Sequence, residues 1–381
     1  MQLIDTAGAL EQAAGELAAC RTFHLDTEFE SSRKGQRLSL LQLNDGKRTI
    51  LFDVLRLERL DPLRRVLSHP ECEWVLHAGI QDVDLLKRSM NLDLPRRVFD
   101  TQVGWAFVGP EYSVSLSYLV YRVLGIRTGK PHQADDWMRR PLGASELEYA
   151  AQDVEHLPAL KRAIEQLASE LGRGDSVHEV CRELLEPRLA TEARDSLRLD
   201  SFRNAWQLDA KSQAALVALI DWYNGLDSAG RERAPEPKTL LAIASRLPQN
   251  AAELARLKGV SQSFAERNGE ALAARLRRAA GSASGSHQPI EPSPYATFQQ
   301  ILSEGWLQAA RAEVCAELRI APELALPNRL LSRIGDELCR GAALSEALGV
   351  LSGWRGRLLG EPIRRYSALH GLPRSPGGAM K

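Results

Sequence analysis

A chain of 381 residues exceeds the length at which one hydrophobic core usually keeps growing, which predicts two or three domains. Lysine plus arginine and aspartate plus glutamate both number 49, so no chain-wide basic field marks a protein that binds polyanions everywhere. Residues 1–175 hold 22 basic and 26 acidic residues, a net charge of −4, and residues 176–381 hold the remaining 27 and 23, a net charge of +4. Residues 1–175 are therefore slightly acidic, and residues 176–381 are slightly basic.

The cysteines and the hydropathy of the chain bear on its cellular environment. Five cysteines are widely spaced with no CxxC pair, which favours reduced thiols and argues against a zinc ribbon or a disulfide scaffold. The first segment, MQLIDTAGALEQAAGELAAC, carries acids and lacks the basic start and apolar run of a signal peptide. No apolar stretch approaches the roughly 20 residues that span a bilayer. We expect a soluble, cytoplasmic protein with no membrane partner.

The front half of the chain shows short β-rich runs that follow an Ala-rich helix. The first run alternates apolar and polar residues, as a half-buried strand does. Asn44-Asp45-Gly46 separates the next two runs and favours an antiparallel meander. Helical stretches then alternate with a further strand, which predicts a mixed α/β sheet. The expected strands cover residues 23–29, 38–43, 49–53 and 74–77.

The pattern turns helical from Leu116 onward. Ser145 and Glu148 have the spacing of a capping box that opens a helix, and Pro158 should end or kink that helix. Beyond about residue 176 only amphipathic helical stretches are expected. A Gly/Ser/Pro-rich segment, GSASGSHQPIEPSP, divides this rear region and is typical of a flexible linker.

Asp26 and Glu28 lie two positions apart on the first expected strand, so their side chains point to the same face. At an effective dielectric constant of about 20, like charges about 4 Å apart repel by roughly 4 kcal/mol. A bound cation would remove this cost, and hard oxygen ligands suit Mg²⁺ or Mn²⁺. For an isolated Asp-x-Glu, the alternative that both carboxylates simply face solvent remains open.

Two further segments carry candidate acids. Asp82 follows the end of an expected strand, in HAGIQDVDLL. Tyr149 precedes Asp153 by four residues in LEYAAQDVEHL, a spacing that places a phenol and a carboxylate on one helical face. Asp84 would point away from Asp82 on its helix and is the weaker candidate.

The segments HLDTEFE, HAGIQDVDLL and LEYAAQDV, with DDWMRRPL just before the last, together resemble the motifs of ribonuclease D in the DEDD exonuclease superfamily. The resemblance extends to the rear half. SFRNAWQLDAKSQAALVALIDW, continuing to about Ala280, is similar to the helicase and ribonuclease D C-terminal (HRDC) domain, and LSGWRGRLL is similar to the closing segment of the family.

This resemblance implies a ribonuclease H-like mixed sheet followed by two small all-α domains. It also implies a centre in which four acids bind two divalent metal ions, Mg²⁺ or Mn²⁺. Carried over by motif, the metal ligands are Asp26, Glu28, Asp82 and Asp153, and Tyr149 marks the tyrosine branch of the superfamily. Because a tyrosine pKa near 10 makes a poor base, Tyr149 would orient water by hydrogen bonding.

The implied function is a 3′-to-5′ exoribonuclease that releases nucleoside 5′-monophosphates. Its implied partner is RNA with a free 3′ end, such as a tRNA precursor, and the protein is expected to be a monomer. Two alternatives stay open: a DNA 3′-5′ exonuclease of the same superfamily, and a non-catalytic RNA-binding protein. The presence of all four acids and the tyrosine argues against the second.

The resemblance and the linker together define the expected domains. These are an exonuclease domain at residues 1–175, a helical connector at 176–200, a first HRDC domain at 201–280, a flexible linker at 281–297, a second HRDC-like domain at 298–372 and a tail at 373–381.

The loop at residues 31–37 departs from the family pattern because it lacks the tyrosines expected there. Arg33, Lys34 and Arg37 are candidates for phosphate contact in that loop, although a solvated basic loop is the simpler interpretation.

Several other residues have a structural and a functional interpretation. His77 is expected to be structural. Trp137 and Trp206 could stack on bases but are expected to anchor cores. The cluster Arg275, Arg277 and Arg278 could follow an RNA backbone or merely end a helix.

Overall fold

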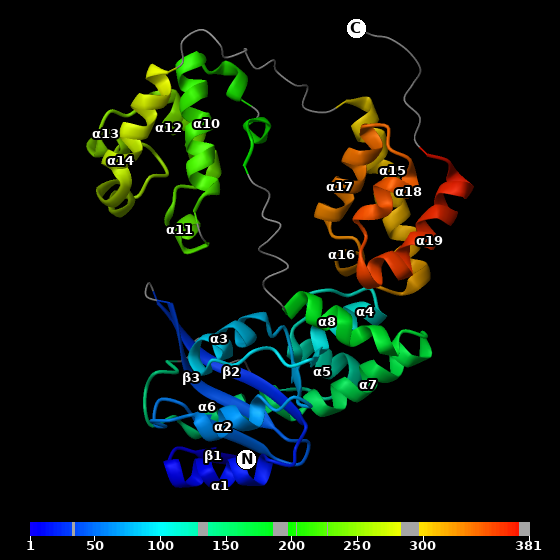
Figure 1. Cartoon of the computed structure of the whole chain (residues 1–381). Helices are drawn as coiled ribbons and strands as arrows, with labels where there is room; N and C mark the ends of the chain where they lie inside the picture. The colour runs from blue at the N-terminus through cyan, green and yellow to red at the C-terminus, as the bar shows by residue number, and fades with distance from the viewer. Residues whose placement is uncertain are drawn as a thin grey trace. The chain divides into compact units, whose positions relative to one another are not determined.

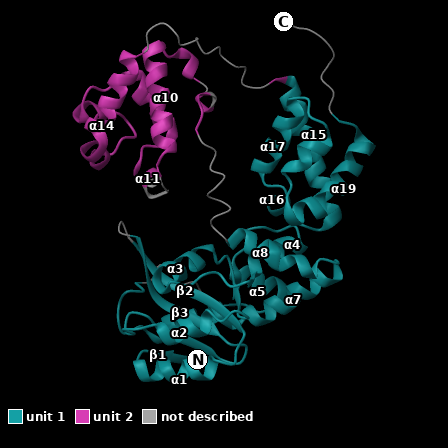
Figure 2. Cartoon of the chain, viewed as in Figure 1, with its two compact units in different colours: residues 1–192, 298–381 teal, residues 193–297 magenta. Residues whose placement is uncertain are grey.

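The structure is a computed structural model that divides into two compact units (Figure 2). The first unit combines residues 1–192 with residues 298–381, and the second comprises residues 193–297. The chain thus leaves the first unit, forms the second and returns to the first. The residues that the structure describes are 1–32, 35–128, 136–185, 197–202, 204–226, 228–282 and 297–372.

The first unit contains a six-stranded mixed sheet in the order β1-β4-β3-β2-β5-β6. Figure 1 labels three of these strands, β1, β2 and β3. The strands β2, β3 and β4 pair antiparallel, which confirms the expected meander, whereas β1, β5 and β6 pair parallel with their neighbours. The strands are β1 (Gln2–Ile4), β2 (Thr22–Ser32), β3 (Gly35–Asn44), β4 (Thr49–Asp53), β5 (Glu73–Leu76) and β6 (Arg97–Asp100).

Alternate residues of the central strands serve two different cores. Leu41 and Leu43 of β3 belong to the main core, with apolar residues of most of the front helices. Leu40 faces the other way and joins Trp137 and Ala150 in a small cluster beneath helix α6. The front helices are α1 (Ala7–Leu17), α2 (Asp61–Leu67), α3 (Ile80–Met90), α4 (Thr101–Val108), α5 (Leu116–Leu124), α6 (Ala144–Glu155), α7 (Leu157–Glu170) and α8 (Val177–Leu185).

The helices that return to the first unit share its main core. The rings of Phe107 and Trp354 meet edge to face at 5.4 Å, and the backbone N–H of Ala321 donates to the carbonyl of Ala106 at 2.8 Å. The Trp354 indole also donates to Glu183 at 2.8 Å. The returning helices are α15 (Phe298–Leu318), α16 (Pro322–Ala325), α17 (Asn328–Cys339), α18 (Leu344–Ala347) and α19 (Gly353–His370).

The second unit is helical throughout its described residues and has a core of its own, which includes Leu219, Ile243 and Phe264. Trp206 is 43% exposed, so the prediction that it anchors this core is wrong. Its short 3-10 turn presents the ring outward. The helices are α10 (Ala210–Asn224), α11 (Ser228–Arg233), α12 (Pro237–Arg246), α13 (Ala251–Ala255) and α14 (Gln262–Gly281).

The expected fold class is confirmed, with two local corrections. Helix α6 begins at Ala144, and the carboxylate of Glu146 accepts the N–H of Gly143, so the predicted capping box of Ser145 and Glu148 is wrong by two positions. The short strands β1 and β6 were missed. Pro158 lies in the first turn of α7, directly after α6 ends, as expected. Among the described residues, no helix is both long and apolar enough to cross a membrane.

Candidate active site

Asp26 and Glu28 lie on β2 beyond the point where its parallel neighbour ends. The pairing of β2 with β5 covers only residues 22–24, whereas its pairing with β3 continues to Ser32. A β-bulge interrupts that pairing between Glu28 and Phe29. The two acids therefore stand at an open sheet edge, on the face that α6 covers.

Asp82 approaches this edge from the first turn of α3. The tight turn that starts α3 places Ala78 at a positive φ of 53° and brings Gly79 so close to Leu76 that a Cβ would lie 2.6 Å from it. The buried carboxylate of Asp100 accepts the N–H groups of Ala78 and Gly79 at 3.2 and 2.9 Å. Asp100 thereby fixes the direction in which α3 leaves the sheet.

The Asp82 carboxylate is held by a residue of the DxE motif itself. Thr27 points to the face opposite Asp26 and Glu28, and its hydroxyl donates to Asp82 at 2.5 Å. Both Thr27 and Asp82 are buried. The strand therefore carries two ligand candidates on one face and a positioning hydroxyl on the other.

Tyr149 and Asp153 come from α6, which the preceding segment fixes on the sheet. The Arg140 guanidinium donates to buried Asp53 at 2.6 Å and to the carbonyl of Trp137 at 2.7 Å. Trp137 is 4% exposed and packs against Tyr149, with ring centroids 6.3 Å apart, in agreement with its expected role as a core anchor.

The structure brings the predicted acids together. Ligand oxygens of Asp26, Glu28 and Asp153 lie within 4.8 Å of one another. Asp82 is not part of this closest set, but its charge acts on both Asp26 and Asp153. Tyr149 shares a hydrogen bond with Asp153.

These carboxylates are electrostatically strained. Burial raises the pKa of Asp26 well above its usual range, and the neighbouring charges of Asp82, Asp153 and Glu28 raise it further. Burial raises the pKa of Asp82 to about 6 and that of Asp153 to about 7, against the hydrogen bonds from Thr27 and Tyr149 that lower them. Burial and the adjacent acids also raise the pKa of Tyr149, which remains a phenol at neutral pH.

A divalent cation fits this donor set. The converging groups are carboxylate oxygens, the ligands that Mg²⁺ and Mn²⁺ prefer. Among the described residues, no lysine or arginine charge contributes to the shifted pKa of Asp26, Asp82 or Asp153. Positive charge at this position would favour the ionised carboxylates, which burial and the nearby acids disfavour.

A second group of acids in the same domain is already neutralised. Glu73 and Glu165 lie near His178, again with ligand atoms within 4.8 Å of one another. The Lys161 ammonium lies 3.4 Å from Glu73 and 2.8 Å from Glu165, and Arg97 lies 3.7 Å from Glu73. These cations make the group a structural ion-pair network.

The structure gives His77 and Asp84 structural roles outside the acidic centre. His77 uses both ring nitrogens, which lie 2.9 Å from the Thr101 hydroxyl and 3.0 Å from the carbonyl of Val114. Asp84 pairs with Arg88 at 2.8 Å on the surface of α3.

The basic residues singled out from the sequence fall into two groups. Arg37 is exposed on β3, whereas Arg33 and Lys34 lie outside the described residues. In α14, the guanidinium groups of Arg275 and Arg277 donate to the carbonyls of Ala218 and Gln249. Those two contacts serve the fold of the second unit.

Sequence reasoning missed the residues that orient the acids, namely Thr27, Asp53, Asp100 and Arg140. Thr27 lies in the segment HLDTEFE and Arg140 in the segment DDWMRRPL. Their place in these family-like segments was the only feature of the sequence that could have indicated a role at the site. Asp53 and Asp100 end strands, and nothing in the sequence distinguishes them from other acids at strand ends.

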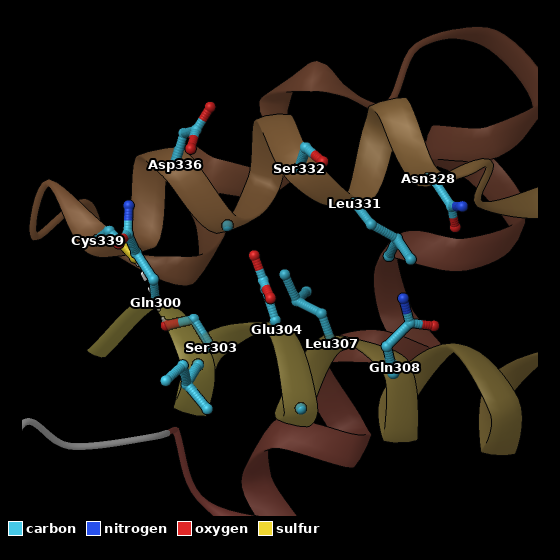
Figure 3. Close-up of a pocket in the computed structure, with 13 residues that line it drawn as sticks. Gln300, Ser303, Glu304, Leu307, Gln308, Asn328, Leu331, Ser332, Asp336 and Cys339 are labelled. Atoms are coloured by element: carbon cyan, nitrogen blue, oxygen red, sulfur yellow. Dashed lines mark hydrogen bonds between the residues drawn. The ribbon is translucent and has the colours of Figure 1, made fainter. Parts of the chain in front are cut away.

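A separate cavity of about 440 Å³ lies between α15 and α17. Figure 3 shows Glu304, Leu307 and Leu331 pointing into the gap between the two helices. Its lining residues include Glu304 and Asp336 and no lysine, arginine or histidine. An anionic nucleic acid would be repelled there, so this cavity is not a candidate catalytic site.

Comparison with known proteins agrees with this geometry. A family model described as 3′-5′ exonuclease matches residues 1–168, and a model of the HRDC domain matches residues 236–276. Ribonuclease D of Musicola paradisiaca (strain Ech703) is 30% identical over 375 residues, which cover 95% of this chain and 97% of that protein. Ribonuclease D of Escherichia coli (strain K12) is 29% identical over 386 residues, covering 97% and 98%.

Two solved structures share the architecture. The crystal structure of Escherichia coli RNase D, described as an exoribonuclease involved in structured RNA processing, aligns with a TM-score of 0.73 and 26% identity over 97% of this chain and 99% of that one. A protein from Bifidobacterium adolescentis aligns with a TM-score of 0.60 at 20% identity, covering 96% of each chain, and shows the fold alone.

Proposed function

Because this chain belongs to the ribonuclease D family and is a 3′-5′ exoribonuclease, we propose that four carboxylates bind two divalent ions at its sheet edge and that it trims structured RNA precursors, tRNA among them. The proposed ligands are Asp26, Glu28, Asp82 and Asp153. The observation that carries the proposal is the convergence of ligand oxygens of Asp26, Glu28 and Asp153 within 4.8 Å of one another, with Asp82 close enough to act on two of them.

The chain's own residues have separable tasks. The four carboxylates bind the cations, Mg²⁺ or Mn²⁺, and Thr27 orients Asp82. When bound, two such ions supply Lewis-acid activation of a water and stabilisation of the charge that develops on the leaving 3′ oxygen. The pairing of β2 with β5 ends before Asp26 and Glu28, and we propose that the 3′ end of the RNA binds at this part of β2.

Tyr149 acts as a hydrogen-bonding group. Its raised pKa keeps the phenol protonated, so it does not serve as a general base at neutral pH. Its hydrogen bond with Asp153 fixes the hydroxyl at the edge of the acidic centre. We assign it to the orientation of the attacking water.

The proposed RNA target draws on a relative. The Escherichia coli enzyme is described as acting in structured RNA processing, and this chain aligns with nearly all of it. We extend that role here to tRNA precursors with a free 3′ end. We also propose that the active protein is a monomer and that it releases nucleoside 5′-monophosphates. Size-exclusion chromatography with light scattering tests the monomer, which a stable dimer peak would contradict.

The proposed domain scheme keeps the boundaries derived from the sequence. The match to the HRDC model at residues 236–276 lies inside the proposed first HRDC domain, residues 201–280. The proposed second HRDC-like domain, residues 298–372, lies in the same compact unit as the exonuclease domain, residues 1–175.

The test is a digest of 3′-extended tRNA by the purified full-length chain, with and without a chelator. We expect shortening from the 3′ end with release of 5′-monophosphates, complete inhibition by the chelator, and restoration by Mg²⁺ or Mn²⁺. Matched RNA and DNA oligonucleotides with free or blocked 3′ ends run beside it. Faster degradation of DNA, or cutting of the blocked RNA at an equal rate, would contradict the proposal.

The non-catalytic alternative is tested on Asp26→Ala. This variant should bind the tRNA substrate in a filter or gel-shift assay with the parent's affinity and should not shorten it. If Asp26→Ala degrades RNA at the parent's rate, the metal assignment is wrong.

A further inference from the structure

Gln42 is a buried side chain whose polar atoms have no partner. Its exposed fraction is 0%, and neither its amide nitrogen nor its carbonyl oxygen makes a hydrogen bond. Among the residues that the structure describes, no other buried side chain leaves two polar atoms in this condition. An unsatisfied buried polar group costs roughly 1–3 kcal/mol, so the arrangement of Gln42 needs an explanation.

The register of the sheet places Gln42 beside the acidic centre. Gln42 is the cross-strand partner of Asp26 on one side and of Leu51 on the other. Side chains of directly opposed antiparallel residues lie about 5 Å apart at their Cβ atoms and point to the same face. The carboxamide is therefore within reach of the Asp26 carboxylate.

The face that carries Gln42 has both polar and apolar neighbours. The next pair along this face is His24 and Asn44, and the His24 ring nitrogen Nδ1 lies 2.9 Å from the Asn44 carbonyl. Leu40 and Leu51 of the neighbouring positions and Ala150 of α6 form the small cluster on this face of the sheet. Leu41 and Leu43, which alternate with Gln42, belong to the main core on the opposite face. Asp26 is thus the ionisable residue that the register places directly opposite the carboxamide.

Another buried glutamine, Gln213, has a hydrogen-bond partner for its side-chain amide. Gln213 is 4% exposed, and its amide donates to the carbonyl of Leu208 at 3.0 Å. A glutamine can therefore be buried in this protein with its donor satisfied. The missing partner of Gln42 needs a separate explanation.

We propose that Gln42 is a positioning residue for the metal centre: its amide N–H donates to the Asp26 carboxylate when that carboxylate binds a divalent cation. The inference rests on the proposed function. Metal-binding carboxylates are generally held by a hydrogen bond from a neighbouring group, and loss of such a partner lowers metal affinity or activity by 10- to 100-fold. The cost of burying the amide is thus offset when the metal binds.

The experiment compares the full-length parent with Gln42→Met, which keeps the length of the side chain and removes the amide. Manganese binding is measured by electron paramagnetic resonance of free Mn²⁺, and stability without metal by urea denaturation. We expect Mn²⁺ affinity to fall about 10- to 100-fold. The metal-free variant should be at least as stable as the parent, because an unsatisfied polar group has been removed.

Gln213→Met serves as the matched control. It removes a satisfied buried amide, so it should lower the stability of the metal-free protein and leave Mn²⁺ affinity unchanged. Gln42→Leu provides a second apolar substitution at the tested position, in case the methionine side chain packs poorly, and should reproduce the loss of affinity.

Each outcome has a defined meaning. Equal Mn²⁺ affinity for the parent and Gln42→Met overturns the assignment of Gln42 and leaves the proposed function intact. If the parent itself binds no Mn²⁺, the proposed metal centre fails. If both apolar variants fail to fold without metal, the amide already has a stabilising partner in the metal-free protein, which also overturns the inference.

Discussion

Two groups of acidic residues in the exonuclease domain have similar spacing and opposite electrostatics. The group of Asp26, Glu28 and Asp153 and the group of Glu73, Glu165 and His178 both place ligand atoms within 4.8 Å of one another. In the second group, Lys161 and Arg97 provide the positive charge. In the first, burial raises the pKa of Asp26 and of Asp153, and the charge of nearby Asp82 raises both further.

The difference shows why proximity of acids alone does not identify a site. An acidic group that is neutralised by its own protein gains nothing from a cation and contributes to stability. An acidic group whose carboxylates have raised pKa values costs stability when it is ionised, and a bound cation would stabilise it. The charge balance around a cluster therefore separates structure from function.

The largest expected effect is the loss of activity in Asp26→Asn. Because partners of metal ligands already cost 10- to 100-fold when removed, loss of a ligand should lower kcat/KM by more than about 100-fold. The same change removes a repelling charge, so the metal-free variant should melt at a higher temperature than the parent. Digestion of 3′-extended tRNA and thermal unfolding with a chelator measure the two effects. A less stable variant would contradict the electrostatic interpretation.

Lys161→Met should lower the stability of the protein and leave its activity nearly unchanged, the opposite of Asp26→Asn. It leaves Glu73 buried with less compensation, and breaking a buried pair costs 3–5 kcal/mol. Because Arg97 and His178 remain, we expect a loss of about 3 kcal/mol in the free energy of unfolding, measured in urea. Exonuclease activity below the unfolding transition should stay near that of the parent.

The double variant Lys161→Met with Glu73→Gln is the control for that interpretation. Removing the unpaired charge should restore part of the lost stability. If the double variant is no more stable than Lys161→Met, the loss came from packing of the lysine stem and not from charge.

Tyr149→Phe should separate water orientation from metal binding. We expect kcat to fall roughly 10- to 100-fold at saturating Mn²⁺, because one oriented hydrogen bond near the reacting groups is lost. Mn²⁺ affinity should change little, since the phenol is not a proposed ligand. A weakened Mn²⁺ affinity with unchanged kcat would assign Tyr149 to the support of Asp153 alone.

The smallest expected effect is a pH dependence of stability confined to the metal-free protein. Burial raises the pKa of Asp153 to about 7 and that of Asp82 to about 6, so the folded state binds more protons than the unfolded state from about pH 4 to 7. The free energy of unfolding should therefore fall as pH rises through this window, by on the order of 1 kcal/mol per pH unit.

Saturating Mn²⁺ provides the comparison for the pH experiment. The bound cation favours the charged carboxylates, so the decline between pH 5 and 7 should shrink or reverse. Urea denaturation at several pH values, with chelator or with Mn²⁺, measures both curves. Parallel curves would show that the acidic group does not bind the ion.

The sequence by itself determined the elements that local patterns encode. Alternation in HLDTEFE gave a strand with Asp26 and Glu28 on one face, and the i, i+4 spacing of Tyr149 and Asp153 placed both on one helix. These inferences depend on residues that are near one another in the chain. Strands β1 and β6 escaped detection because strands of only 3 and 4 residues carry little periodic signal.

Only the tertiary structure decided which acids have a cationic partner among the described residues. Glu73 reads in the sequence like any strand acid, and its partner Lys161 lies far along the chain, on α7. Likewise, the position of Gln42 opposite Asp26 is a matter of strand register. The physical reason is that charge balance and desolvation depend on every group packed around a side chain, and those groups come from distant segments that only the folded chain brings together.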